Sequence, residues 1–149
     1  MNARPVSIVM IEDDEGHARL IERNIRRAGV NNEITSFRNG TDGLTYLLGA
    51  DGSGEESAQR SMLILLDLNL PRKSGRDVLA EIKVDPALRS IPVVILTTSS
   101  AEDDVRRSYD LHANCYIVKP YDYYSFVDAI QSIRHFWFSV ATLPAEPGA

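Results

Sequence analysis

Buried strands are predicted where short apolar runs recur along the chain. The runs at residues 6–11, 62–66, 92–96 and 115–118 are nearly continuous, and a shorter, partly alternating stretch covers 33–37. Short unbroken apolar runs are typical of strands buried on both faces, as in the middle of a parallel sheet. The sequence therefore predicts five strands.

Helices are predicted after each run, because apolar residues there recur at the spacing of a helix face. The first interval is an example, with Ala18, Ile21 and Ile25 in phase behind a capping Asp14. The helices are expected from residue 14 to Gly29, over 41–48, around 78–84, after a capping box of Ser99 and Glu102, and over 122–141. Strands that alternate with helices make a parallel sheet with helices on both faces. The expected fold class is α/β, a doubly wound five-stranded parallel sheet.

Composition excludes several classes of protein. The 149 residues are 44% hydrophobic and 25% charged, which suits one domain over 1–149, with a core at about 6–135 and an extended C-terminal helix and short tail at about 136–149. The net charge of −5 disfavours a nucleic-acid partner, and no apolar run is long enough to span a membrane. Cys115 is the single cysteine, so a reducing, cytoplasmic location is expected.

Candidate chemistry lies at the ends of the predicted strands. Glu12 and Asp13 follow the first strand, Asp67 the third, Thr97 the fourth and Lys119 the fifth. Because the carboxyl ends of parallel strands share one edge of a sheet, these side chains are expected to converge. Crowded carboxylates raise one another's pKa unless a cation lies among them, and oxygen-only ligands suit Mg²⁺. Thr97 and Lys119 could then bind a phosphoryl group on Asp67, since aspartate is an accepted nucleophile.

Each of these residues also has a simpler interpretation when it is taken alone. Glu12 and Asp13 could be acids favoured by a helix dipole, and Asp67 could cap a turn. Thr97 could be an ordinary strand residue and Lys119 a solvated loop lysine. Their shared position at one edge of the sheet favours the functional interpretation.

These motifs in combination resemble a known family. Glu12-Asp13, the Asp-Leu-Asn-Leu-Pro segment at 67–71, Thr97 and Lys119-Pro120 are similar to the signature of the response-regulator receiver domain of two-component signalling. The resemblance covers about residues 6–135 and implies the flavodoxin-like strand order 2-1-3-4-5. It also implies a sensor histidine kinase as partner. The chemistry it implies is phosphate acceptance and autodephosphorylation, without enzymatic turnover.

The resemblance implies a Mg²⁺-dependent phosphoacceptor site. Asp67 would accept the phosphoryl group and contact the metal. Asp13 would bind the metal directly, Glu12 would hold a metal-bound water, and the backbone carbonyl of Asn69 would be a further ligand.

The resemblance also implies a switch. Thr97 and Lys119 would contact the phosphoryl oxygens, and Tyr116 would turn inward as the Thr97 hydroxyl engages the phosphoryl group. The Lys119–Pro120 peptide bond would be cis.

The C-terminal helix carries more apolar side chains than one core-facing stripe can absorb. Phe136 and Phe138 flank Trp137, which belongs to a stripe that starts at Phe126. We predict a homodimer through Phe136, Trp137 and Phe138; the alternatives are that the chain near 143–144 folds back over them or that another protein covers them. This ending, with the acidic glycine-rich insertion at 49–59, is similar to stand-alone response regulators of bacterial phytochrome histidine kinases.

Two other functions remain open at this stage. An Asp-nucleophile phosphatase-like enzyme would use similar chemistry, but usually with a second acid two residues on, where this chain has Asn69. A phosphorylation-independent scaffold receiver would be expected to have lost an acid or the lysine. His17, His112 and His135 lack metal-ligand spacing, and we expect surface or half-buried roles for them.

Overall fold

The computed structural model describes residues 6–26, 33–49 and 61–137. Its centre is a parallel sheet in the order β2-β1-β3-β4-β5, which confirms the predicted fold class and strand order. The strands are β1 (Val6–Ile11), β2 (Ile34–Phe37), β3 (Ser61–Leu66), β4 (Val93–Thr97) and β5 (Cys115–Val118). β1 pairs with β3 over its whole length, from Val6 opposite Ser61 to Ile11 opposite Leu66.

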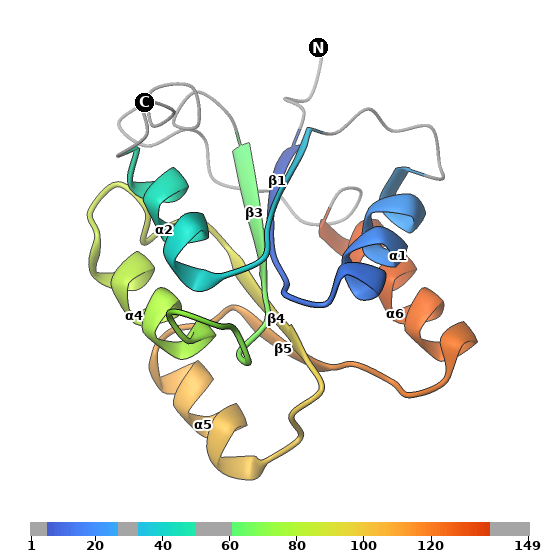
Figure 1. Ribbon diagram of the computed structural model, residues 1–149. Coiled ribbons are helices and arrows are strands. Elements are labelled where there is room, and N and C mark those ends of the chain that lie inside the picture. The colour runs from blue at the N-terminus through green and yellow to red at the C-terminus, as the bar shows by residue number, and fades with distance from the viewer. Residues whose placement is uncertain (1–5, 27–32, 50–60, 138–149) are drawn as a thin grey trace.

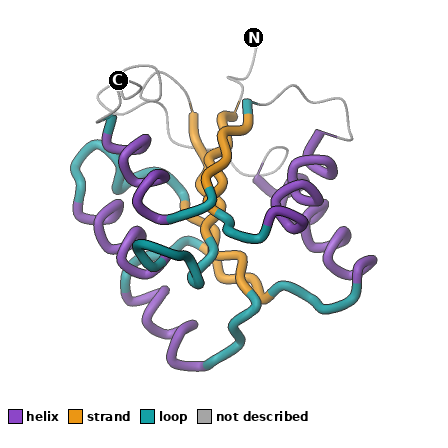
Figure 2. Tube along the Cα trace, viewed as in Figure 1, coloured by secondary structure: helices purple, strands orange, loops and turns teal. Residues whose placement is uncertain are grey.

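Helices cover both faces of the sheet (Figure 1). α1 (Glu15–Arg26) and α6 (Tyr123–His135) lie on one side, and α2 (Gly40–Leu48), α4 (Gly75–Val84) and α5 (Glu102–Asp110) lie on the other. The strands form a single layer between them (Figure 2). Alternate strand residues therefore enter two separate cores: Ile8 and Met10 pack with α1 and α6, and Val9 and Ile11 pack with α2 and α4. Burial on both faces is the physical reason for the continuous apolar runs.

Four helices begin at a capping side chain. Asp14, Asn39, Ser74 and Asp122 each accept a hydrogen bond from the backbone N–H three residues later, at the starts of α1, α2, α4 and α6. The caps fix where each helix leaves the carboxyl edge of the sheet.

The capping box predicted for α5 is wrong. The helix begins after Ala101, which makes no side-chain cap hydrogen bond. The Ser99 hydroxyl instead donates to Asp104 Oδ2 at 2.6 Å, so it is committed to a side chain inside the helix. As expected for so polar a helix, Ser108 is its one buried residue.

The C-terminal helix confirms its predicted core stripe, with Phe126, Ile130 and Ile133 buried. A π-helical turn at Phe136 and Trp137 follows α6, and the rest of the predicted helix lies outside the described residues. The predicted first-helix stop at Gly29 and most of the predicted loop at 49–59 also lie outside them. In the part of the chain that the structure describes, no helix has the length and apolar character needed to cross a lipid bilayer.

Candidate phosphoryl-transfer site

Backbone hydrogen bonds just beyond the sheet bring the strand ends together. The N–H of Asp67 donates to the Ile11 carbonyl at 3.0 Å, and the N–H of Lys119 donates to the Thr97 carbonyl at 2.7 Å. β1, β3 and β5 thus present Glu12, Asp67 and Lys119 side by side at one edge, as the sequence predicts.

The turn after Asp67 leaves no room for a side chain at Gly75. A Cβ there would lie 2.0 Å from the Asp67 carbonyl oxygen and 2.7 Å from the Leu68 Cα. The Gly75 N–H donates to the Leu68 carbonyl at 2.9 Å. The start of α4 therefore rests directly on the backbone of Asp67 and holds that residue in place.

A pocket of about 220 Å³ opens at this edge of the sheet. Carboxylate oxygens of Glu12, Asp13 and Asp67 all lie within 4.8 Å of one another, so the predicted crowding is present. Glu12 and Asp67 are buried, whereas Asp13 is exposed. The pocket is lined by Glu12, Asp13, Asp14, His17, Asp67, Asn69, Thr98 and Lys119.

The buried Lys119 ammonium lies among these groups. It donates to Glu12 Oε1, to Asp67 Oδ2 at 3.2 Å and to His17 Nδ1 at 3.0 Å. Desolvation by burial raises the pKa of Glu12 to about 7, with a further rise from the Asp67 charge, although the hydrogen bond from Lys119 lowers it. One lysine therefore offsets the crowded negative charge only in part.

The donor set fits a hard divalent cation. Glu12, Asp13 and Asp67 offer only carboxylate oxygens, and the open pocket leaves room for water ligands, a combination that suits Mg²⁺. Asp67 Oδ1 already accepts the Asn69 N–H at 3.1 Å, which orients the carboxylate. Asn69 itself lines the pocket, as the proposed carbonyl ligand must.

Thr97 reaches the edge but does not line the pocket. It is fully buried, and its Oγ1 has no hydrogen-bond partner among the residues that the structure describes. The exposed Thr98, which lies just beyond the end of β4, lines the pocket instead. Spacing alone singled out Thr97 and missed Thr98.

His17 is half-buried, as expected, but its place in the pocket was missed. α1 begins directly after the acidic pair, so its first turn passes over the strand ends and carries His17 into the pocket. The spacing between the cap Asp14 and His17 could have indicated this.

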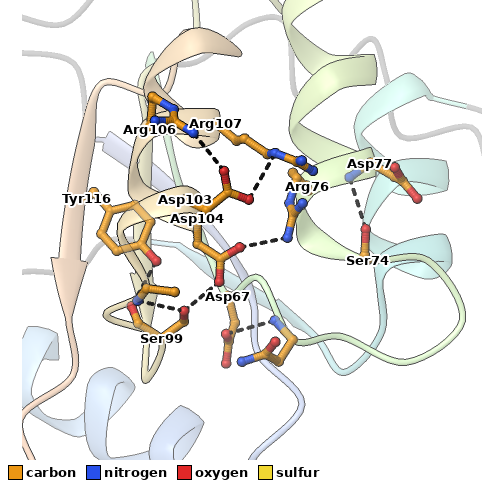
Figure 3. A network of polar contacts seen from close by, with 12 residues as sticks. Asp67, Ser74, Arg76, Asp77, Ser99, Asp103, Asp104, Arg106, Arg107 and Tyr116 are labelled. Atoms are coloured by element: carbon orange, nitrogen blue, oxygen red, sulfur yellow. Dashed lines mark hydrogen bonds and ion pairs between the residues drawn. The ribbon is translucent and has the colours of Figure 1, made fainter.

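Tyr116 is tied to the loop after β4 by a chain of polar contacts (Figure 3). Its hydroxyl donates to the Ser99 carbonyl at 2.8 Å, while Ser99 Oγ donates to Asp104. Asp104 Oδ1 in turn accepts from Arg76 of α4 at 2.8 Å. Burial raises the pKa of the Tyr116 hydroxyl, which stays neutral and donates. The position of the loop after β4 and the orientation of the Tyr116 side chain are therefore coupled.

The Lys119–Pro120 peptide bond is trans, since the described residues contain no cis peptide bond. The expectation of a cis bond is wrong for this structure, and trans is the form that an X–Pro bond ordinarily favours.

The aromatic end of α6 is partly described. The Phe136 side chain is 49% exposed and meets Trp137 edge-on, with ring centroids 5.1 Å apart. Trp137 packs against the core between the sheet and α1 and α6. Phe138 lies outside the described residues.

Comparison with known proteins places this site in a family. A family model described as the response regulator receiver domain matches residues 8–131. The chain therefore belongs to the response regulator receiver family, whose members signal by phosphorylation in two-component systems.

Among individual proteins, the chain is 44% identical to the response regulator Rcp1 of Synechocystis, over 95% of each chain. It is 56% identical to a receiver domain crystal structure from Rhodospirillum rubrum, covering 95% of this chain and 99% of that one, with a TM-score of 0.87. It is 44% identical to the phosphorylated cyanobacterial phytochrome response regulator RcpA, covering 96% and 100%, also with a TM-score of 0.87. Rcp1 has been crystallised in a Mn²⁺-bound form.

Proposed function

We propose that this receiver accepts a phosphoryl group on Asp67 from a sensor histidine kinase and then changes its contacts with other proteins. The carrying observation is that the buried Asp67 carboxylate lies 3.2 Å from the Lys119 ammonium in a pocket shared with Glu12 and Asp13. The similarity to phosphorylated RcpA supports the reaction, and that to Mn²⁺-bound Rcp1 supports a divalent cation.

Asp67 is the nucleophile of the proposed reaction. One of its carboxylate oxygens bonds to phosphorus while the P–N bond of the kinase phosphohistidine breaks, and the electron pair of that bond stays on the donor imidazole. Lys119 pairs with a phosphoryl oxygen, from a position already beside Asp67. Mg²⁺ held by Asp13, Asp67 and the Asn69 carbonyl, with Glu12 holding a metal-bound water, would neutralise charge on the transferring group.

Switching follows from the residues next to the pocket. The buried Thr97 hydroxyl lacks a partner among the described residues, so a phosphoryl oxygen would give it one. Moving Thr97 toward the phosphoryl group would shift the loop after β4, and Tyr116 is bonded to that loop through Ser99. The exposed Thr98 is placed to contact the phosphoryl group or the water that later removes it.

The kinase partner and the cellular location are proposed from the similarity to known proteins. The phytochrome link of RcpA supports a bacterial phytochrome kinase as the phosphoryl donor. We further propose a single receiver domain over 1–149, intrinsic autodephosphorylation without turnover on other substrates, no nucleic-acid partner and a cytoplasmic location.

Phosphate-affinity electrophoresis tests the acceptor directly. Wild type should be labelled by acetyl phosphate with Mg²⁺, and Asp67→Asn, which keeps the size of the side chain, should not. Equal labelling of both proteins would move the acceptor elsewhere. Rapid turnover of a generic phosphomonoester would instead favour a phosphatase.

We also propose that the protein forms a homodimer through the end of α6. Phe136 is half exposed on a helix whose other face is buried in the core, and a twofold contact would cover it twice. Burying an aromatic side chain contributes roughly 1.5–3 kcal/mol. Light scattering should give twice 16.6 kDa for wild type. Phe136→Ala should lower the mass, whereas a wild-type monomer, or an unchanged Phe136→Ala dimer, would contradict the proposed interface.

A further inference from the structure

His17 lines the phosphoryl pocket, yet the chemistry above gives it no role. Its Nδ1 lies 3.0 Å from Lys119 Nζ and 3.8 Å from Asp14 Oδ2. Only the shorter distance is within hydrogen-bonding range. An ammonium can donate but cannot accept, so Nδ1 must carry a lone pair that faces Lys119. The contact therefore assigns the lone pair to Nδ1 and the ring proton to Nε2.

With this contact, all three N–H groups of the Lys119 ammonium have acceptors: Glu12 Oε1, Asp67 Oδ2 and His17 Nδ1. The carboxylates of Glu12 and Asp67 belong to the proposed metal and phosphoryl chemistry, so their bonds to Lys119 must rearrange during phosphorylation. His17 is the one acceptor of the three that takes no part in that rearrangement.

His17 is held in place by two contacts, one to the cap of its own helix and one to α6. Its backbone N–H donates to Asp14 Oδ1 at 2.9 Å in the cap of α1. Its ring packs edge-on against Phe126 of α6, with centroids 5.2 Å apart and planes at 86°. An acceptor fixed by a helix cap and by core packing can hold Lys119 in one place while the other two contacts change.

We propose that His17 is a positioning residue: it holds the Lys119 ammonium where the phosphoryl group on Asp67 will form. The inference rests on the proposed function, since it assigns Lys119 to the phosphoryl oxygens. His17 acts through Lys119 and needs no contact with the phosphoryl group.

The test compares an acceptor with an apolar side chain at the same position. His17→Asn places an amide oxygen near the place of Nδ1, whereas His17→Leu fills space without an acceptor. His135→Leu, on the exposed end of α6, is the matched control. Initial rates of labelling by acetyl phosphate are measured at saturating Mg²⁺ and donor, and this small donor excludes effects on kinase docking. The ¹⁵N shifts of the imidazole report its tautomer.

We expect His17→Leu to be slower by roughly 10-fold, the lower end of effects seen when a supporting shell is lost. His17→Asn should recover most of the rate, His135→Leu should match wild type, and the ¹⁵N spectrum should show Nε2–H with an unprotonated Nδ1. A wild-type rate in His17→Leu, equal losses in the Leu and Asn variants, or a proton on Nδ1 would each overturn the positioning role alone. Failure of wild type to be labelled on Asp67 would overturn the proposed function with it.

Discussion

Burial of Glu12 should make the metal-free protein less stable as the pH rises toward neutrality. The fold raises the pKa of Glu12 from 4.5 to about 7, mainly through desolvation. Between these values the folded protein retains a proton that the unfolded chain has released. The stability contributed by that proton is fully present below about pH 4.5 and is lost as the pH rises through about 7. A rise of the pKa from 4.5 to about 7 corresponds to roughly 3 kcal/mol in the free energy of unfolding.

Urea unfolding in EDTA measures this loss, with Glu12→Gln as the matched variant. Glutamine keeps the size and can still accept from Lys119, but it does not titrate. The free energy of unfolding of wild type, minus that of Glu12→Gln, should therefore fall across pH 5 to 8. Saturating Mg²⁺ should restore the stability of wild type at the upper end, because the nearby cation favours the ionised form of Glu12. A difference that does not change with pH in EDTA would refute the reasoning.

Three further outcomes are expected. Asp13→Ala should abolish labelling by acetyl phosphate, because the exposed oxygen donor of the acidic cluster is lost; undiminished labelling of this variant in EDTA would contradict the metal site. Lys119→Ala should accept some phosphoryl group but fail to switch, so phosphorylation-induced fluorescence changes equal to those of wild type would contradict its role. Gly75→Ala should destabilise the fold by about 1–3 kcal/mol or more in urea unfolding, because its Cβ would overlap the Asp67 carbonyl. Gly16→Ala, whose Cβ would meet only a side-chain oxygen at 3.3 Å, should be tolerated, and similar losses in both variants would contradict the steric argument.

The fold could be predicted because its strongest signals are local. Strands buried on both faces must be apolar throughout, so the runs ending at Ile11 and Leu66 located the central pair of strands. Parallel pairing then placed the residues that follow them at one edge. The α5 start was not predictable in this way, because Ser99 could bond either to the helix backbone or to Asp104, and tertiary packing decides between them.

The sequence could predict which residues converge at the site, but not how their side chains are bonded and oriented. Sequence indicated that Glu12, Asp67 and Lys119 converge, but not that Lys119 is bonded to both carboxylates. Thr97 is the last residue of β4 and Thr98 lies just beyond it, so which threonine faces the pocket depends on the backbone conformation where the strand ends. His17 enters the pocket because of the direction in which α1 leaves the sheet, and residue spacing does not contain that direction.

The close approach of Gly75 to Asp67 affects how variants of this receiver should be ranked. In a substitution scan scored by phosphorylation alone, changes at Gly75 would reduce labelling as strongly as changes at Asp67. Gly75 nevertheless offers no side-chain atom to the reaction. A parallel score for folded protein would separate them: Asp67→Asn should remain folded and silent, while substitutions at Gly75 should lose fold and activity together. Which substitutions are tolerated around Asp67 therefore depends on the space next to its backbone as well as on the chemistry of phosphoryl transfer.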